Sequence, residues 1–188
     1  MRAGPRELSE LSRVLPDPLP TKANLGCGYD RREGYLNVDL YPHEGTADFI
    51  ADISDLRIFP SGHFEELVAY DVIEHFERDR VVGILKGWAR LLRQDGVLKL
   101  RAPNLLKLAA ALAAPENRNA KVAAHLMHLI YGTQAYSGDY HLAGFTPELL
   151  TSQLAEAGLV VTKSEVLDAY NLTVTARLGG ATPAETLS

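Results

Sequence analysis

Residues 22–40 read KANLGCGYDRREGYLNVDL and place a glycine-rich turn between two short apolar runs. The first run, Lys22–Leu25, leads into the Gly-Cys-Gly turn at 26–28, and the second, Tyr35–Leu40, contains Asp39. Glycines let a backbone approach a ligand closely, and ligands of open α/β sheets lie beyond the carboxyl ends of the strands. A carboxylate one strand over can accept both hydroxyls of a ribose. The stretch therefore predicts a parallel sheet with a nucleoside-binding edge.

The rest of the chain alternates short apolar runs with helical patterns. Further strands are predicted at Phe49–Ala51, Glu66–Tyr70, Val97–Arg101, Val160–Val166 and Thr173–Arg177. Helices are predicted over Asp79–Arg93, over Asn104–Ala114, over Arg118–Tyr131, and from Thr146 to the residue before Gly158. Strands separated by helices indicate a mostly parallel sheet with helices on both faces. The predicted fold class is α/β: a three-layer, Rossmann-like, mostly parallel seven-stranded sheet that ends in an antiparallel hairpin.

The chain is expected to form one domain. Residues 1–20 are a lead-in with an amphipathic helix at 5–15, residues 21–178 are the α/β domain, and residues 179–188 are a flexible tail. Only nine residues, Gly26 to Gly34, join the first two strands, whereas a parallel crossover commonly takes a dozen or more. We therefore expect at most one or two helical turns there, with the N-terminal helix covering the sheet surface left bare.

Composition excludes several classes of protein. The net charge of −5 and the pI of about 5.7 argue against a duplex nucleic-acid binder, which needs a basic surface. The single cysteine, Cys27, allows no internal disulfide and favours a reducing compartment. No apolar run reaches the roughly 18 residues of a membrane span, and the N-terminus lacks the apolar segment of a signal peptide. We expect a cytoplasmic protein, and the oligomeric state stays open.

The third strand candidate ends in Asp52 and Ile53. A carboxylate beside an apolar side chain can accept the exocyclic amine of adenine while its neighbour packs on the ring, although Asp52 alone would also fit a surface turn. NAD is disfavoured as the ligand. Its fingerprint needs a third glycine, where this chain has Arg31, and an acidic residue about twenty positions on, whereas Asp39 follows Gly28 by eleven.

The fourth strand candidate runs into the sequence YDVIEHF at 70–76. A catalytic group placed there would face the reactive end of the ligand. His75 is the predicted general base, because an imidazole can exchange a proton near neutral pH, and Asp71 is a possible helper. The alternative is that Glu74 and His75 only cap or pair within the following helix.

Taken in order, these segments resemble a known family. The segments are Leu25–Gly28, Gly34–Asp39, Asp52, Val72–Phe76, Leu91–Arg93, Gly96–Leu98 and Pro103–Asn104. They look like the class I S-adenosylmethionine-dependent methyltransferases of the type 11 kind, especially small bacterial members. Two turns depart from the family pattern: Gln94-Asp95-Gly96 replaces Pro-Gly-Gly, and Phe64-Glu65 replaces Phe-Asp.

The resemblance implies S-adenosylmethionine as cofactor and S-adenosylhomocysteine as product. Gly26 and Gly28 would line the methionine part, Asp39 would hold the ribose, Asp52 would face the adenine, and Asp71 would lie at the sulfonium side. The full set expected around the cofactor is Leu25, Gly26, Cys27, Gly28, Asp39, Leu40, Asp52, Ile53, Tyr70, Asp71 and Val72.

The resemblance also implies an acceptor site after the fifth strand, in the polar and aromatic loop before Thr146. The residues expected there are Tyr131, Gln134, Tyr140 and His141, and the alternative is a loop packed under its own aromatic side chains. His125 and His128 are expected on a helix surface. The expected acceptor is small and polar, a hydroxyl of a sugar or secondary metabolite. The alternatives are a non-catalytic relative and a nucleic-acid methyltransferase.

A metal ion is conceivable at this edge. Asp71, Glu74 and His75 have a spacing similar to that of some metal-dependent methyltransferases, and His141 could add a ligand. Most proteins with this strand-end motif need no metal, so none is expected.

Overall fold

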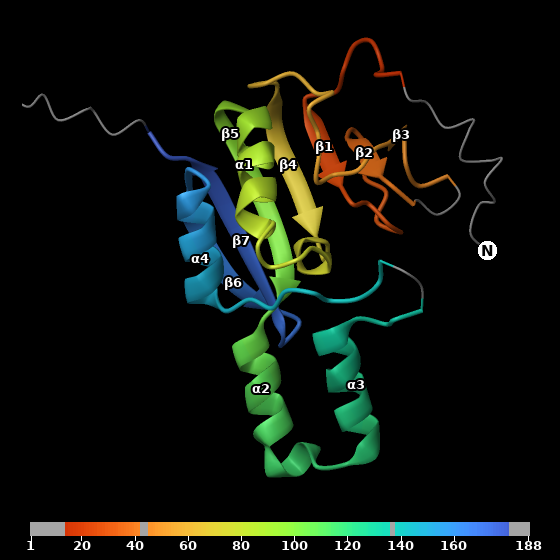
Figure 1. Ribbon diagram of the computed structural model, residues 1–188, viewed down its shortest axis with the longest axis vertical. Helices are drawn as coiled ribbons and strands as arrows, with labels where there is room; N and C mark the ends of the chain where they lie inside the picture. The colour runs from red at the N-terminus through yellow and green to blue at the C-terminus, as the bar shows by residue number, and fades with distance from the viewer. Residues whose placement is uncertain (1–13, 42–44, 136–137, 181–188) are drawn as a thin grey trace, which may run out of the picture.

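The computed structural model describes residues 14–41, 45–135 and 138–180 (Figure 1). Seven strands form one sheet in the order β3-β2-β1-β4-β5-β7-β6, in which β7 runs antiparallel to both β5 and β6 and the other pairs are parallel. The strands are β1 (Lys22–Leu25), β2 (Leu36–Asp39), β3 (Phe49–Ile50), β4 (Phe64–Tyr70), β5 (Leu92–Pro103), β6 (Leu159–Leu167) and β7 (Asn171–Leu178). The predicted mostly parallel sheet with a closing antiparallel hairpin is confirmed.

The four described α-helices fall into two pairs. They are α1 (Val81–Leu91), α2 (Leu105–Ala113), α3 (Ala120–Tyr131) and α4 (Pro147–Glu156), with short 3-10 helices η2 (Ile73–His75) and η3 (Pro115–Asn117). Helices α1 and α4 pack against each other and against the sheet, whereas α2 and α3 form a hairpin that projects beyond the carboxyl ends of β4 and β5 (Figure 1). The second pair therefore stands where a ligand of such a sheet binds.

The helix starts follow from side-chain capping. Asn104, Asn119 and Thr146 each accept a backbone N–H from the first turn of α2, α3 and α4, which satisfies donors that a helix start otherwise leaves unpaired. The predicted end of α1 at Arg93 was two residues late. The chain enters β5 directly at Leu92 and then bulges before it pairs regularly again. Gly96 makes this possible, because a Cβ there would lie 2.7 Å from the carbonyl oxygen of Phe64.

The segment between β1 and β2 contains no helix, which agrees with the prediction of at most one or two helical turns. Two buried amides hold it instead: Asn24 donates to the Asn37 side chain at 3.2 Å. Asn37 in turn accepts the N–H of Arg32 at 2.8 Å and donates to the Asp48 carboxylate at 2.8 Å. Side-chain hydrogen bonds thus fix this loop and set the position of the glycines that begin it.

Aromatic side chains fill the core beneath the strand ends. Trp88 of α1 is 1% exposed and donates its indole N–H to the Ile53 carbonyl at 2.8 Å, which ties the segment after β3 to the helix layer.

The predicted N-terminal helix at 5–15 lies outside the described residues except for Val14 and Leu15, which are not helical. Within the described ranges, no helix is long and apolar enough to cross a membrane.

Candidate functional site

Two adjoining clefts open at the carboxyl edge of the sheet. The first, of about 270 Å³, lies beyond β1, β2, β3 and β4, and we call it the strand-end cleft. It is lined by Gly26, Gly28, Asp39, Leu40, Tyr41, Asp52, Ile53, Asp71, Val72, His75, Phe76 and Gly138. Nine of these twelve residues were predicted as site residues from the sequence; Tyr41, Phe76 and Gly138 were not. The ends of four neighbouring strands therefore converge as the sequence pattern required.

Gly26 brings the first loop against the end of β4. Its φ is +65°, and an added Cβ would lie 2.5 Å from Cγ2 of Val72 and 3.3 Å from Cδ1 of Ile53. Both the left-handed backbone and the lack of space disfavour a larger residue. The glycine is required for the close approach that forms the inner wall of the strand-end cleft.

Asp39 is held rigidly at the end of β2. One carboxylate oxygen accepts the N–H of Gly28 at 2.9 Å, and the other accepts the N–H of Tyr41 at 2.8 Å. Each oxygen of an ionised carboxylate can accept more than one hydrogen bond. Asp39 therefore connects the loops after β1 and β2 and still has capacity for two hydroxyl groups of a ligand.

Asp52 and Ile53 are positioned by local bonds. Oδ1 of Asp52 accepts the N–H of Ser54 at 2.8 Å, which fixes the side chain in a tight turn, while Trp88 holds the Ile53 carbonyl. Asp52 is exposed, and its second oxygen has no hydrogen bond that we find among the described residues. An exposed acceptor beside a buried apolar side chain fits the amine edge and the face of an adenine.

Asp71 borders both clefts. Its φ is +53°, and its carboxylate is paired on both oxygens with the guanidinium of Arg101, with Nε donating to Oδ1 at 2.9 Å. The same guanidinium lies 4.9 Å from the ring centroid of Tyr70. Because a bidentate arginine occupies this carboxylate, Asp71 is suited to orientation and charge rather than to accepting a proton.

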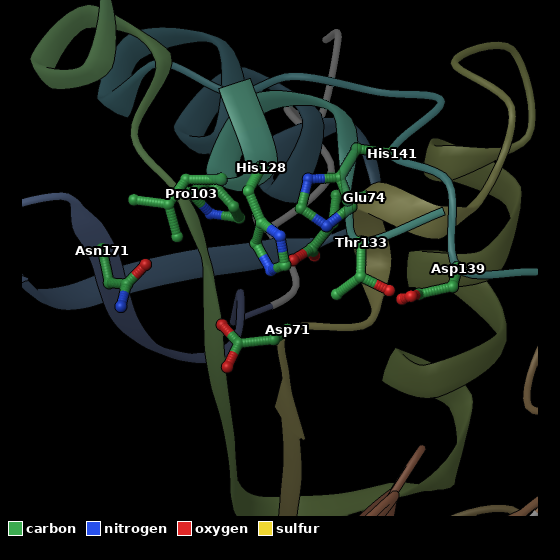
Figure 2. A pocket seen from close by; sticks show the side chains of 10 residues that line it. Asp71, Glu74, Pro103, His128, Thr133, Asp139, His141 and Asn171 are labelled. Atoms are coloured by element: carbon green, nitrogen blue, oxygen red, sulfur yellow. The ribbon is translucent and has the colours of Figure 1, made fainter. Parts of the chain in front are cut away.

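The second cleft, of about 190 Å³, is lined by Asp71, Glu74, Pro103, His128, Leu129, Gly132, Thr133, Asp139, His141 and Asn171, and we call it the histidine cleft. It lies between the ends of β4 and β5, the end of α3 and the loop that follows α3. Figure 2 shows the side chains of Glu74, His128 and His141 gathered on one side, with Asp71 facing them.

The loop after α3 is docked onto η2 through its backbone. The N–H groups of Leu142 and Ala143 both donate to the carbonyl of Glu74, at 2.7 and 3.0 Å, and the N–H of His141 donates to the carbonyl of Tyr131 at 3.1 Å. As a result the rings of His75 and His141 lie 4.9 Å apart at an angle of 81°. Two imidazoles that are distant in sequence thus meet beside Asp71.

Glu74 is buried with its carboxyl group unpaired. The residue is 1% exposed, and neither carboxyl oxygen has a hydrogen-bond partner in the part of the chain that the structure describes. Burial raises the pKa of Glu74 to about 8, and the negative charge of Asp71 adds to this, while the N–H of Glu74 itself and Arg101 oppose it. Glu74 therefore carries a proton at neutral pH.

His141 shows the opposite shift. Burial lowers the pKa of its imidazole, and the nearby His75 lowers it further, while the carbonyls of Leu129 and Ile130 oppose the change. The ring is therefore neutral near pH 7 and keeps a nitrogen lone pair. Such a group can take up a proton or bind a metal ion.

Several predicted residues lie outside the cleft walls. Leu25 and Cys27 are 0% and 3% exposed and point into the core, and Tyr70 lies between the guanidinium groups of Arg32 and Arg101. Because side chains alternate along a strand, a residue at a strand end contacts a ligand through its side chain only when it is on the right side. Side-chain contacts of these three residues with a cofactor remain predictions.

Of the residues predicted to bind the acceptor, some line the histidine cleft and others do not. His141 lines the histidine cleft, whereas Tyr131 and Tyr140 supply backbone carbonyls to His141 and to the Nδ1 of His75. Gln134 donates its N–H to the Asp139 carbonyl. His128 is exposed on α3, as expected, yet it also lines the histidine cleft. Asn171 was missed because it reaches the cleft only through the pairing of β7 with β5 at Pro103.

Comparison with known proteins identifies the fold. No family model matches the chain, and no curated protein matches it. Among solved structures, 1,6-didemethyltoxoflavin-N1-methyltransferase of Burkholderia thailandensis, with S-adenosylhomocysteine bound, is similar with a TM-score of 0.59 and 16% identity over 85% of this chain and 71% of that one. An S-adenosylmethionine-dependent methyltransferase of Clostridium acetobutylicum gives a TM-score of 0.55 and 13% identity over 85% and 84%.

A third similar structure is the mitomycin 7-O-methyltransferase MmcR, with a TM-score of 0.55 and 15% identity. The match covers 85% of this chain and 49% of MmcR, so this chain spans about half the length of that enzyme. At such identities the likeness establishes the fold. The chain has the fold of the class I S-adenosylmethionine-dependent methyltransferases.

Proposed function

We propose that this chain transfers a methyl group from S-adenosylmethionine to a hydroxyl group of a small polar acceptor. The observation that carries the proposal is that the two clefts share Asp71 as a common wall. A ligand in the strand-end cleft and a ligand in the histidine cleft would therefore meet at the end of β4. Alignment of two reactants is the main contribution that an enzyme makes to a displacement at carbon.

The strand-end cleft fits this cofactor. Asp39 has capacity for the ribose hydroxyls, Asp52 and Ile53 suit the adenine, and the glycine backbone at 26–28 leaves room beside them. When bound, S-adenosylmethionine supplies an electrophilic methyl carbon next to a positively charged sulfur. The carboxylates of Asp39 and Asp52 give the cleft a negative character that complements that charge, whereas the charge of Asp71 is paired with Arg101.

The histidine cleft fits an acceptor that must lose a proton. His75 lines the strand-end cleft and His141 lines the histidine cleft, and their rings are 4.9 Å apart. A hydroxyl placed between the clefts would lie beside both imidazoles, and the neutral His141 ring can accept its proton. The sequence-based assignment of His75 as the base thus extends to a histidine pair.

Size and lining support a small acceptor. The histidine cleft is about 190 Å³ and presents Thr133, Asp139 and Asn171, which can hydrogen-bond a hydroxyl-rich molecule. Two of the similar structures, the toxoflavin-precursor and mitomycin enzymes, are by their names methyltransferases for small molecules. The net charge of −5 disfavours a nucleic-acid acceptor.

Transfer assays with labelled cofactor test the proposal. Purified chain is incubated with S-adenosylmethionine carrying a labelled methyl group and with small-molecule fractions sorted by chemical class. We expect label in a hydroxyl-bearing small molecule. Failure to bind S-adenosylhomocysteine in calorimetry would overturn the cofactor assignment, and binding without transfer to any fraction would favour a non-catalytic relative.

A further inference from the structure

Glu74, His75 and His141 form a compact group of potential metal ligands. Each offers one ligand atom, and these three atoms lie within 4.8 Å of one another. Glu74 is buried, and the two histidines are half-buried. The backbone hydrogen bonds that dock the loop after α3 onto Glu74 hold the backbone of the group together.

The state of Glu74 points to a missing partner. Both carboxyl oxygens are shielded from solvent and without a hydrogen-bond donor among the described residues. Burial of an unpaired polar group costs free energy that a native structure seldom leaves uncompensated. The Glu74 side chain extends into the histidine cleft beside His141 (Figure 2). A cation at the centre of the three ligand atoms would satisfy the carboxylate.

Backbone carbonyls stand behind both imidazoles. The Nδ1 of His75 lies 3.2 Å from the carbonyl oxygen of Tyr140, and the carbonyls of Leu129 and Ile130 face the ring of His141. Histidines that bind metal ions commonly donate their other ring N–H to a carbonyl or carboxylate, which fixes the tautomer and the ring plane. His75 therefore has the carbonyl support that metal-binding histidines commonly have.

We propose that Glu74, His75 and His141 bind a divalent transition-metal ion of the Zn²⁺ class, with an open coordination position toward the histidine cleft. Two imidazoles and one carboxylate suit Zn²⁺, Fe²⁺, Co²⁺ and Ni²⁺ better than Mg²⁺ or Ca²⁺, which prefer oxygen ligands. Three protein ligands plus one open position is also the usual pattern of a catalytic zinc site. The sequence alone favoured no metal, because most proteins with this strand-end motif need none; the structure adds that Glu74 is buried and that His141 lies within reach of it.

The role of this ion rests on the proposed function, although its binding does not. An acceptor hydroxyl that coordinates the ion becomes more acidic: its O–H bond breaks, the electron pair stays on oxygen, and the proton passes to water. The two imidazoles then act as ligands instead of bases. The two roles are separable, because only the ligand role predicts that a chelator abolishes transfer.

Calorimetry on the full chain, stripped with a chelator and then freed of it, tests the site. We expect Zn²⁺ and Co²⁺ to bind with one-to-one stoichiometry, and bound Co²⁺ to give the visible absorption of a low-coordinate complex. Glu74→Gln and His141→Ala should each weaken binding more than about 100-fold, because changes outside the ligand set already cost about 10–100-fold. His125→Ala, which removes an exposed imidazole of α3 outside the cleft lining, is the matched control and should bind normally.

Glu74→Gln keeps the shape of a buried side chain and removes only its ability to ionise, so folding is expected and is checked by circular dichroism. Absence of one-to-one binding, or undiminished binding by Glu74→Gln, would overturn the metal site. S-adenosylhomocysteine is titrated separately with chelator present. If it binds while no metal does, the metal site fails and the proposed function stands; if metal binds while it does not, the proposed function fails and the site stands.

Discussion

The two clefts at the edge of the sheet are built in opposite ways. In the strand-end cleft Asp39 ends β2 and Asp52 closely follows β3, and neighbouring N–H groups bond both oxygens of Asp39 and one oxygen of Asp52. The histidine cleft joins η2 to a loop 65 residues further along and encloses a carboxyl group with no partner among the described residues. The first cleft is pre-organised by local hydrogen bonds, whereas the second encloses the carboxyl group of Glu74, which no hydrogen bond among the described residues satisfies.

The largest effect should come from the histidine pair. His75→Ala and His141→Ala should each lower the rate of methyl transfer by about 10²–10⁴-fold, whether the pair removes a proton or holds an ion that does so. Affinity for S-adenosylhomocysteine should change by no more than about threefold, because neither ring is needed to hold the cofactor. His125→Ala serves as the control. Transfer by either variant within about threefold of the unmodified chain would contradict a catalytic role.

Substitution of Asp39 should instead lower the affinity for the cofactor. Asp39→Ala should weaken binding of S-adenosylhomocysteine at least tenfold, because the loss of a charged acceptor for two hydroxyls costs about 1.5–3 kcal/mol. Asp39→Asn keeps one acceptor oxygen, so its affinity for S-adenosylhomocysteine should lie between those of the unmodified chain and Asp39→Ala. Thermal unfolding of each variant separates loss of binding from loss of the Gly28 and Tyr41 hydrogen bonds. Unchanged affinity in a folded Asp39→Ala protein would exclude the ribose role.

A pair of glycine variants tests the wall of the strand-end cleft. Gly26→Ala should lower the free energy of unfolding by about 1–3 kcal/mol, since it combines a left-handed backbone with a clash against Val72. Gly28→Ala has a φ of +49° and nothing within 4 Å of its added Cβ, so it carries the backbone cost alone. Urea unfolding should therefore show the larger loss at Gly26. Equal losses would mean that close approach to Val72 is not the constraint.

The last prediction concerns the pH dependence of stability and the unpaired carboxyl group of Glu74. The pKa of Glu74 rises from an ordinary 4.5 to about 8, so between these values the folded chain holds a proton that the unfolded chain has released. The contribution of Glu74 to stability is thus complete at low pH and is lost as the pH rises toward 8. In metal-free protein, Glu74→Gln should remove this decline and be at least as stable as the unmodified chain at pH 8. Parallel pH curves for the two proteins would contradict the shift.

Much of the fold and half of the site were predictable because their determinants are local. A few neighbouring residues determine each helix start at Asn104 and Thr146. The same holds for the short segment between β1 and β2. Asp39 and Asp52 were found for the same reason. Parallel strands bring their carboxyl ends to one edge, so each residue that follows a strand has a known position.

The histidine cleft was only partly predictable because it depends on tertiary contacts. The sequence marks Glu74 as polar, and only the packing of Leu142 and Ala143 onto its carbonyl shows that it is enclosed. Tyr131 and Tyr140 were predicted only as residues of an acceptor site, and the structure adds that their backbone carbonyls bond the N–H of His141 and the Nδ1 of His75. The sequence cannot predict which backbone carbonyl takes such a role, because every residue carries one.

A crystal structure of the chain with S-adenosylhomocysteine would show whether the two clefts act together across Asp71. We predict the ribose on Asp39, the adenine between Asp52 and Ile53, and the sulfur directed past Asp71 toward His75 and His141. A ligand bound elsewhere, or bound with its sulfur turned away from the histidine pair, would contradict the account.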